Sequence, residues 1–409
     1  MKSWMLAAAV PVAIGVMAAA LAAEDAARRP LYGATWEGSL RLARIDPDSL
    51  RPLAGRRVGL AGEPLGWSFA PDRSRLALGS APRGAELRLI DLRRMRALGD
   101  VRVARRGSAI ATAWAGPRRV IAVVVTPGCC GAGDTIVAGV DVRRRRVVWE
   151  RRLGGSLQAG ERLRRGVLLV LGPRGRSIGP SRLVEVRARG TTHSAALPEI
   201  RSGTESRGRV SHSWDPGLAV DRSSGRAFVV QAEAPLAEVD LATFAVRWHP
   251  LQPMARAADA AAGPTRHALW LGRGTLAVTG SDTDHSGGRE RTTPAGLTLV
   301  DTRRWRARTI DSRTTDVAVA AGTVLASSFV FDSRRGTTAG SGLTGYDLDG
   351  TRRFHLFGKA AIPGVQPLGR RALVGTMSGN TLIDARTGRS LRTYRRFTAS
   401  LFAGDAPFQ

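Results

Sequence analysis

A short signature recurs eight times along this chain of 409 residues and constrains the fold more than any other feature. Each copy places two apolar or small residues around one variable position, then an acid, an apolar residue and a turn. Examples are "LRLIDLRRMRAL" around Asp91 and "LTLVDTRRWRART" around Asp301. Recurrence at a roughly fixed spacing is typical of repeat architectures. The acids of the eight copies are Asp46, Asp91, Asp141, Glu185, Asp240, Asp301, Asp347 and Asp384.

Each signature predicts a strand, a tight turn and a returning strand. We expect the acid to end the first strand and to accept hydrogen bonds from backbone N–H groups of the turn, which is a structural role. Two more apolar runs precede most copies, as in "LGWSFAPDRSRLALGSA" before Asp91. Four short strands per unit, at this period, predict an all-β chain folded as a β-propeller of four-stranded antiparallel blades.

The two ends of the chain favour a closed ring. The first signature has only its returning pair of strands, and "RRFTASLFAGDAPFQ" after Tyr394 has an apolar run without a signature. Strands from both ends would complete one mixed blade and remove the exposed sheet edges. The count is then eight blades, or seven if the N-terminal pair only caps an edge. We expect one propeller domain over residues 32–409.

The N-terminus is typical of an export signal. Residues 1–22 combine a weakly basic start, an apolar stretch and an A-x-A-like cleavage pattern, and residues 23–31 form a short linker. An uncleaved membrane anchor is the alternative, because the stretch is nearly long enough to span a bilayer. No cysteine lies nearby, which excludes a lipid-anchored precursor, and no later stretch of spanning length lacks a charge. We therefore expect a secreted or extracytoplasmic protein that is not integral to the membrane after cleavage.

The formal net charge of +28 is carried almost entirely by arginine. Nucleic-acid binding would predict basic residues clustered on one element, with aromatic residues for stacking, whereas these arginines are spread over the chain and only 5% of residues are aromatic. We therefore expect no nucleic-acid partner. For an exported protein, such a charge indicates attraction to anionic envelope polymers or lipid head groups. A coding bias toward arginine at solvated positions is the structural alternative.

The only two cysteines, Cys129 and Cys130, are adjacent in "VTPGCCGAGD". An exported protein can oxidise its thiols, so they can pair with each other or with another molecule, or stay free. A bond between neighbours closes a strained ring, which the flanking glycines would accommodate. Such a ring would make a loop tip rigid or offer a flat apolar surface to a ligand.

Other candidate sites are weaker. In "TGSDTDHSGGRERTT", Asp282 and Asp284 resemble the front half of a calcium loop, but Thr293 stands where a bidentate glutamate is required, so a polar hairpin tip explains the stretch without a metal. The six histidines show no paired metal-ligand spacing. His212 and Trp214 in "VSHSWDPG" begin a strand and could reach the mouth of the ring. No nucleophile elbow or phosphate loop occurs, so the catalytic residues are unknown.

The units resemble the YVTN and quinoprotein-type repeats of exported bacterial β-propellers, most closely in "LIDARTGRSLRTY" and "VDVRRRRVVWERRL". The resemblance covers nearly the whole mature chain but specifies blades rather than chemistry. Quinoprotein alcohol dehydrogenases place a disulfide between adjacent cysteines against their quinone, and only Cys129 and Cys130 match that feature. Their calcium ligands, catalytic aspartate and tryptophan docking motifs have no match on this shorter chain.

The sequence predicts an exported, non-catalytic propeller that acts as a binding or scaffold module at the cell envelope. We expect its ligand, an unidentified protein or polymer, at one mouth of the ring, beside the loops 125–134 and 279–293. We expect no cofactor, and nothing in the sequence indicates oligomerisation, so we expect a monomer. The alternatives are a propeller-class enzyme such as a quinoprotein-like oxidoreductase, and an electrostatic binder of anionic envelope polymers.

Overall fold

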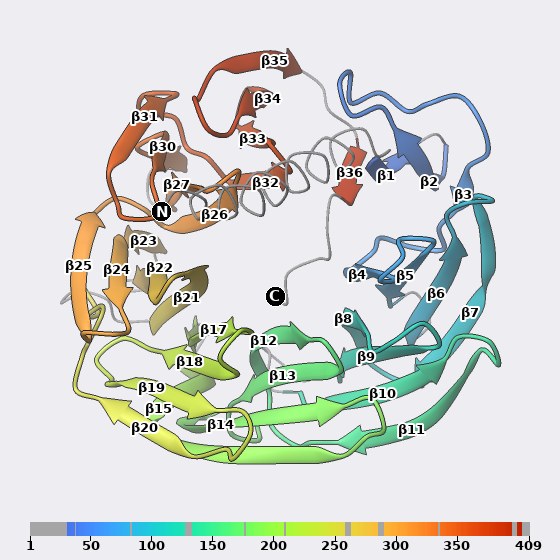
Figure 1. Ribbon diagram of the computed structural model, residues 1–409, viewed down its shortest axis with the longest axis horizontal. Helices are drawn as coiled ribbons and strands as arrows, with labels where there is room; N and C mark the ends of the chain where they lie inside the picture. Colours follow the sequence, from blue (N-terminus) through green and yellow to red (C-terminus); the bar gives the residue numbers. More distant parts are fainter. Residues whose placement is uncertain are drawn as a thin grey trace, which may run out of the picture.

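The chain folds into eight sheets arranged around a ring (Figure 1). The computed structural model describes residues 31–36, 38–81, 84–126, 133–175, 177–207, 210–257, 263–284, 290–333, 336–394 and 399–402. These residues form strands and turns, and no helix that could cross a membrane is found among them. The predicted all-β propeller is confirmed, and of the two predicted blade counts the sheets give eight.

We number the blades along the chain and give their strands from the inner to the outer side of the ring. The first four blades are β36 (Ala399–Phe402), β1 (Leu31–Trp36), β2 (Leu40–Ile45) and β3 (Val58–Gly59); β4 (Gly66–Phe69), β5 (Arg75–Ser80), β6 (Ala85–Asp91) and β7 (Arg96–Ala104); β8 (Ser108–Trp114), β9 (Arg119–Val125), β10 (Thr135–Asp141) and β11 (Arg146–Arg152); and β12 (Leu157–Leu163), β13 (Gly166–Leu171), β14 (Ile178–Arg187) and β15 (Thr192–Arg207), with β16 (Val210–Trp214) paired to β15.

The other four blades complete the ring. They are β17 (Gly217–Asp221), β18 (Arg226–Val230), β19 (Leu236–Asp240) and β20 (Val246–His249); β21 (Gly263–Gly272), β22 (Thr275–Asp284), β24 (Leu297–Asp301) and β25 (Arg306–Asp311); β26 (Asp316–Ala320), β27 (Thr323–Ser327), β30 (Leu343–Tyr346) and β31 (Arg352–Leu356); and β32 (Gly364–Leu368), β33 (Arg371–Thr376), β34 (Gly379–Asp384) and β35 (Ser390–Tyr394).

The two ends of the described chain close the ring, as predicted. β36 pairs antiparallel with β1, in a register that runs from Tyr32 opposite Phe402 to Thr35 opposite Ala399. The Phe402 ring then packs against Trp67 of the second blade, with ring centroids 4.7 Å apart. The first blade therefore combines strands from both ends of the described chain. As a result, every blade is packed between two other blades.

The core lies between neighbouring blades rather than at one centre. Eight clusters of buried apolar side chains fill the eight spaces between successive sheets. The second strand of a blade is covered on both sides, so β9 reads "RVIAVVV" and β13 reads "GVLLVL". Burying one such side chain contributes about 1.5–3 kcal/mol. The outermost strand β11, "RVVWERR", is covered on one side only and alternates in exposure over its first residues.

Antiparallel blades give the ring two different faces. The connections from first to second strand and from third to fourth strand lie on one face, which we call the turn face. The connections from second to third strand, and from each blade to the next, lie on the opposite face, which we call the insertion face. The turn face has short connections in blades two to eight, such as 92–95 and 142–145.

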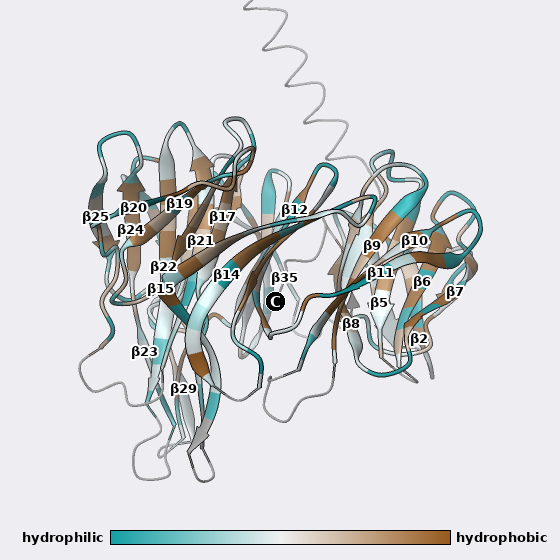
Figure 2. Ribbon diagram, turned by 90° about the horizontal axis from the view of Figure 1, so that it is seen from below, coloured by the Kyte–Doolittle hydropathy of each residue, from teal (hydrophilic) through white to brown (hydrophobic). Residues whose placement is uncertain are grey.

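The insertion face carries a projecting sheet that the repeat pattern does not predict. The hairpin that extends β22 adds β23 (Arg291–Pro294), and the seventh blade contributes β28 (Val330–Asp332) and β29 (Thr337–Ala339). β23 pairs with β28 through Arg291 and Asp332, so the two insertions form one sheet. Figure 2 shows β23 and β29 extending beyond the level of the blades on this side.

Candidate functional site

On the turn face, six of the eight signature acids bind the backbone of their own turn. The Asp46 carboxylate accepts from the amide of Ser49 at 2.6 Å, and the Asp240 carboxylate accepts from Ala242 and Thr243 at 2.8 and 2.9 Å. These bonds hold the turn that reverses the chain between the third and fourth strands. The same arrangement is found at Asp91, Asp141, Asp301 and Asp384.

Glu185 and Asp347 depart from this arrangement. Glu185 is buried within β14, and its carboxylate accepts from the Arg187 guanidinium at 2.9 Å. Asp347 pairs with Arg353, while Asp349, two residues later, accepts the turn amide of Thr351 at 2.8 Å. The signature therefore marks the position of the turn in these blades but not the residue that holds it.

Backbone hydrogen bonds lower the pKa of five of the turn carboxylates, those of Asp46, Asp141, Asp240, Asp301 and Asp384. The amide of Ser49 lowers the pKa of Asp46, and the amide of Arg144 lowers the pKa of Asp141. Burial raises the pKa of Asp384, but the bonds from Thr387 and Arg386 outweigh it and the net shift is downward. These carboxylates are therefore committed to the turns, in keeping with a structural role.

The turns around these acids carry a large excess of positive charge. In blades two to eight, the connections of the turn face contain seventeen arginines but only three aspartates. Six more aspartates end strands at this face, but eight arginines begin the strands that follow its turns, so the excess remains. The seventeen are Arg73, Arg93, Arg94, Arg118, Arg143, Arg144, Arg145, Arg164, Arg165, Arg189, Arg222, Arg273, Arg303, Arg304, Arg370, Arg386 and Arg389.

The described connections of the insertion face are nearly neutral by comparison. They contain six basic residues and five acidic ones, which are Arg105, Arg106, Arg174, Arg256, Arg313 and Lys359 against Glu63, Asp134, Asp215, Glu233 and Glu290. The arginines are spread along the sequence, but the fold gathers those of the turns on one side of the ring. A face with one sign of charge attracts an oppositely charged partner over roughly the Debye length.

Those sequence candidates with chemical roles that the structure describes, His212, Trp214, Asp282 and Asp284, belong to the insertion face. Cys129 and Cys130 lie outside the described residues, and their loop leaves β9 at Thr126, whose amide donates to the Asp134 carbonyl at 3.0 Å. Trp214, at the end of β16, lies between two guanidinium groups, with the Arg201 and Arg256 carbons 5.3 and 5.5 Å from its ring. His212 lies opposite Glu205 in the β15–β16 ladder. These contacts fix the β15–β16 extension by cation–π attraction.

Asp282 is committed to a buried ion pair. Its carboxylate accepts from the Arg266 guanidinium at 2.7 Å and from the Ala257 amide at 2.6 Å, and both charged side chains are almost inaccessible to solvent. Asp284 lies opposite Arg291 across the hairpin. No group of three His, Cys, Asp or Glu residues suited to a metal is found in the described part of the chain. Asp282 therefore anchors the base of the projecting sheet, and calcium is not needed to explain it.

On the innermost side of the ring, two aspartates that the sequence did not single out lie within the electrostatic influence of His267, one of the six histidines. Asp215 accepts from the Thr265 hydroxyl at 3.1 Å, and burial raises its pKa against the effect of His267. Asp316 begins β26 with an exposed side chain, and desolvation by the surrounding protein raises its pKa, again opposed by His267. The three residues come from successive blades about one repeat apart in sequence. No sequence pattern marks them, because Asp215, His267 and Asp316 stand at different positions relative to the first strands of their blades.

The fold defines the class of this protein, which is a β-propeller. No family model and no curated protein matches the chain. Among solved structures it is similar to a dihydro-heme d1 dehydrogenase, NirN, in complex with DHE, at 14% identity over 93% of this chain and 76% of that chain, with a TM-score of 0.58. It is also similar to BamB from Moraxella catarrhalis, at 13% identity over 84% and 92%, with a TM-score of 0.45. At such identities the likeness concerns the fold alone.

Proposed function

We propose that this chain is an exported, non-catalytic β-propeller that works as a binding module at the cell envelope, and that its turn face attaches it to anionic polymers or lipid head groups there. The observation that carries the proposal is the ratio of seventeen arginines to three aspartates in the connections of this face. The export signal predicted over residues 1–22 supplies the compartment.

The shape of the turn face supports the same function. Its connections in blades two to eight are short, and their arginines all belong to the same side of the ring, where they can contact one extended anionic surface together. Each arginine near an anionic membrane surface contributes about 1 kcal/mol, and such contributions accumulate over a face. The long insertions lie on the opposite face and would remain free for other partners.

Vesicle binding tests the proposal. We expect the protein to bind vesicles of phosphatidylcholine mixed with phosphatidylglycerol, and to bind pure phosphatidylcholine vesicles far more weakly. Raising the ionic strength from about 0.05 M to about 0.5 M should abolish the difference, because the Debye length falls to a few ångströms. Equal binding to both kinds of vesicle, or binding to the anionic kind that survives high salt, would contradict an electrostatic attachment.

A further inference from the structure

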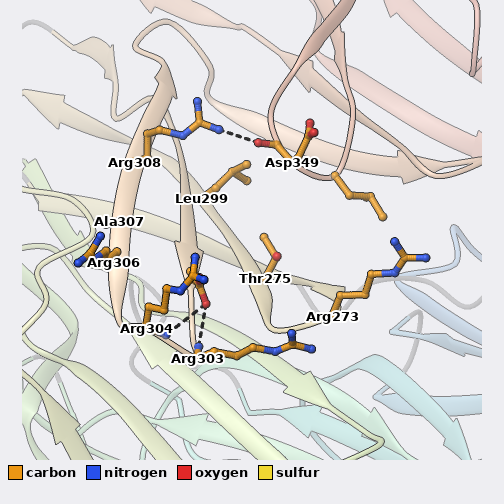
Figure 3. A pocket seen from close by; sticks show the side chains of 11 residues that line it. Arg273, Thr275, Leu299, Arg303, Arg304, Arg306, Ala307, Arg308 and Asp349 are labelled. Atoms are coloured by element: carbon orange, nitrogen blue, oxygen red, sulfur yellow. Dashed lines mark hydrogen bonds between the residues drawn. The ribbon is translucent and has the colours of Figure 1, made fainter.

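The turn face contains a cleft between the sixth and seventh blades that is lined by five arginines. The cleft has a volume of about 590 Å³. Arg273 comes from the β21–β22 turn, Arg303 and Arg304 from the β24–β25 turn, and Arg306 and Arg308 from β25 (Figure 3). Thr275 and Leu299 form part of its wall, and the turn of the seventh blade closes one side.

Most of these guanidinium groups have no carboxylate partner. Among the described residues, no ion pair involves Arg273, Arg303, Arg304 or Arg306. Arg308 differs because it donates to the Asp349 carbonyl at 2.6 Å and so ties the sixth blade to the seventh. Four unpaired guanidinium groups around one cleft repel one another unless an anion or water separates them.

The two carboxylates of the cleft are already engaged. Asp301 accepts the amides of Arg303 and Arg304 at 2.9 and 3.2 Å, and Asp349 accepts the amide of Thr351 at 2.8 Å. Five guanidinium groups against two carboxylates leave a formal excess of three positive charges. A single carboxylate ligand would leave most of this excess, whereas a phosphoryl group offers more acceptor oxygens for guanidinium forks and brings one charge as a diester or up to two as a monoester.

We infer that this cleft is a specific binding site for a phosphoryl group, carried by an anionic lipid head group or by a soluble phosphate compound. The inference builds on the proposed function, since it adds one selective site to a face that attracts anions in general. The volume exceeds that of one phosphate ion and leaves room for the group to which the phosphate is attached.

The third blade supplies a matched control for this site. Its turn, Asp141 to Arg146, has arginines at the positions of Arg303, Arg304 and Arg306, and the Arg144 amide donates to Asp141 as the Arg304 amide donates to Asp301. Arg143→Gln with Arg144→Gln therefore removes the same charge from the same face as Arg303→Gln with Arg304→Gln. Neither pair changes the backbone bonds that hold the turn.

The experiment measures pyrophosphate binding by calorimetry at low ionic strength, with thermal unfolding as the control for folding. We expect the Arg303→Gln, Arg304→Gln protein to bind pyrophosphate at least about tenfold more weakly than wild type, because two charge-assisted contacts are lost. The Arg143→Gln, Arg144→Gln protein should stay within about twofold. Equal weakening in both variants, or no binding by the wild type, would overturn the inference. Arg304→Lys, which keeps the charge but loses the planar fork, should bind less well than wild type.

Vesicle measurements on the same proteins show whether the phosphoryl group comes from a lipid or from a soluble compound. They also distinguish failure of the cleft from failure of the proposed function. If pyrophosphate displaces the wild type from phosphatidylglycerol vesicles, the head group occupies the cleft; if it does not, the site takes soluble phosphates. Equal losses in both variants, together with retained salt-sensitive vesicle binding, would reject the cleft and keep the proposed function. Selective pyrophosphate binding without vesicle binding would reject the proposed function and keep the cleft.

Discussion

The turn face and the insertion face are built by the same eight repeats, yet their described connections differ in charge and in length. The turn face has short connections held by aspartates such as Asp240 and Asp301 and is lined with arginines. The described connections of the insertion face contain six basic and five acidic residues, and this face also has longer extensions and the buried ion pair between Arg266 and Asp282. Regular turns suit contact with an extended surface, and irregular extensions suit contact with a shaped partner.

Charge on a propeller can be segregated to one face without any cluster in the sequence. A blade of four antiparallel strands sends alternate connections to opposite faces, so residues about one repeat apart meet on the same side. Arg94, Arg144 and Arg304 occupy equivalent turns of three blades and therefore add their fields on one face. In the sequence, each of these arginines is seen only as part of a separate basic turn.

The largest effect is expected from reversing charge on the turn face. Arg93, Arg94 and Arg143 changed to glutamate should weaken binding to phosphatidylglycerol vesicles by at least about a hundredfold, since each arginine contributes about 1 kcal/mol and each glutamate opposes binding. Sedimentation with vesicles at low ionic strength measures the loss.

The matched control reverses three exposed arginines of the insertion face, Arg105, Arg106 and Arg174. This variant changes the net charge by the same amount. If binding depends on the charge of the turn face, its affinity for vesicles should stay within a fewfold of wild type. Equal losses in the two triple variants would show that net charge alone matters and would remove the distinction between the faces.

The second largest effect is expected at the buried ion pair. Asp282→Asn leaves the Arg266 charge buried without its partner, and the free energy of unfolding should fall by about 3–5 kcal/mol. Chemical denaturation measures this loss. A change below about 1 kcal/mol would mean that water or another group replaces the carboxylate, and that the projecting sheet does not depend on this anchor.

A smaller effect is expected at a turn acid. Asp384→Ala removes the bonds from Arg386 and Thr387 and should cost about 1 kcal/mol of stability. The pKa of Asp384 is lowered in the folded protein, so its contribution is present above the unfolded pKa of about 3.9 and disappears as the pH falls through the folded value. Denaturation at neutral and acid pH should show the variant converging on wild type as the pH falls below the unfolded value. A constant difference would contradict the role of the carboxylate.

At Asp215 we expect the opposite pH dependence of stability. Burial raises its pKa, so wild-type stability falls as the pH rises from the unfolded value of about 3.9 through the folded value. Asp215→Asn removes the buried charge and keeps an oxygen for the Thr265 hydroxyl. We expect a gain of a few tenths of a kcal/mol at neutral pH and no gain at acid pH. A loss at neutral pH would mean that the carboxylate has a favourable partner.

The smallest change concerns Cys129 and Cys130. We expect the oxidised protein to resist alkylation until it is reduced, as a disulfide between adjacent cysteines requires, with little change in stability because almost no loop is closed. Intact mass before and after alkylation decides the matter. Two thiols that react without reduction would reject the bond.

The repeat signature predicted the four-stranded blades and their closure by β1 and β36, because these features depend on local hydrophobic patterns and turn residues. It did not predict the pairing of β23 with β28, since two insertions from different blades meet only after the ring has formed. It assigned Glu185 and Asp347 the same turn role as Asp46, although an arginine two to six residues away binds each of them instead. Local patterns locate turns, but they do not show which donor binds each carboxylate: Arg187 lies on the same strand as Glu185, and Arg353 lies on the strand that follows Asp347.

The sequence by itself determined that this chain folds as a closed array of β blades, because each repeat has apolar strands that only neighbouring repeats can cover. The tertiary structure alone decided which distant residues share a surface. It gathers turn arginines from separate repeats on one face, leaves Arg273, Arg303 and Arg304 around one cleft, and buries Arg266 against Asp282. The physical reason is that burial and strand pairing act between neighbouring residues, whereas the electrostatic field of a face depends on how all the blades are arranged around the ring.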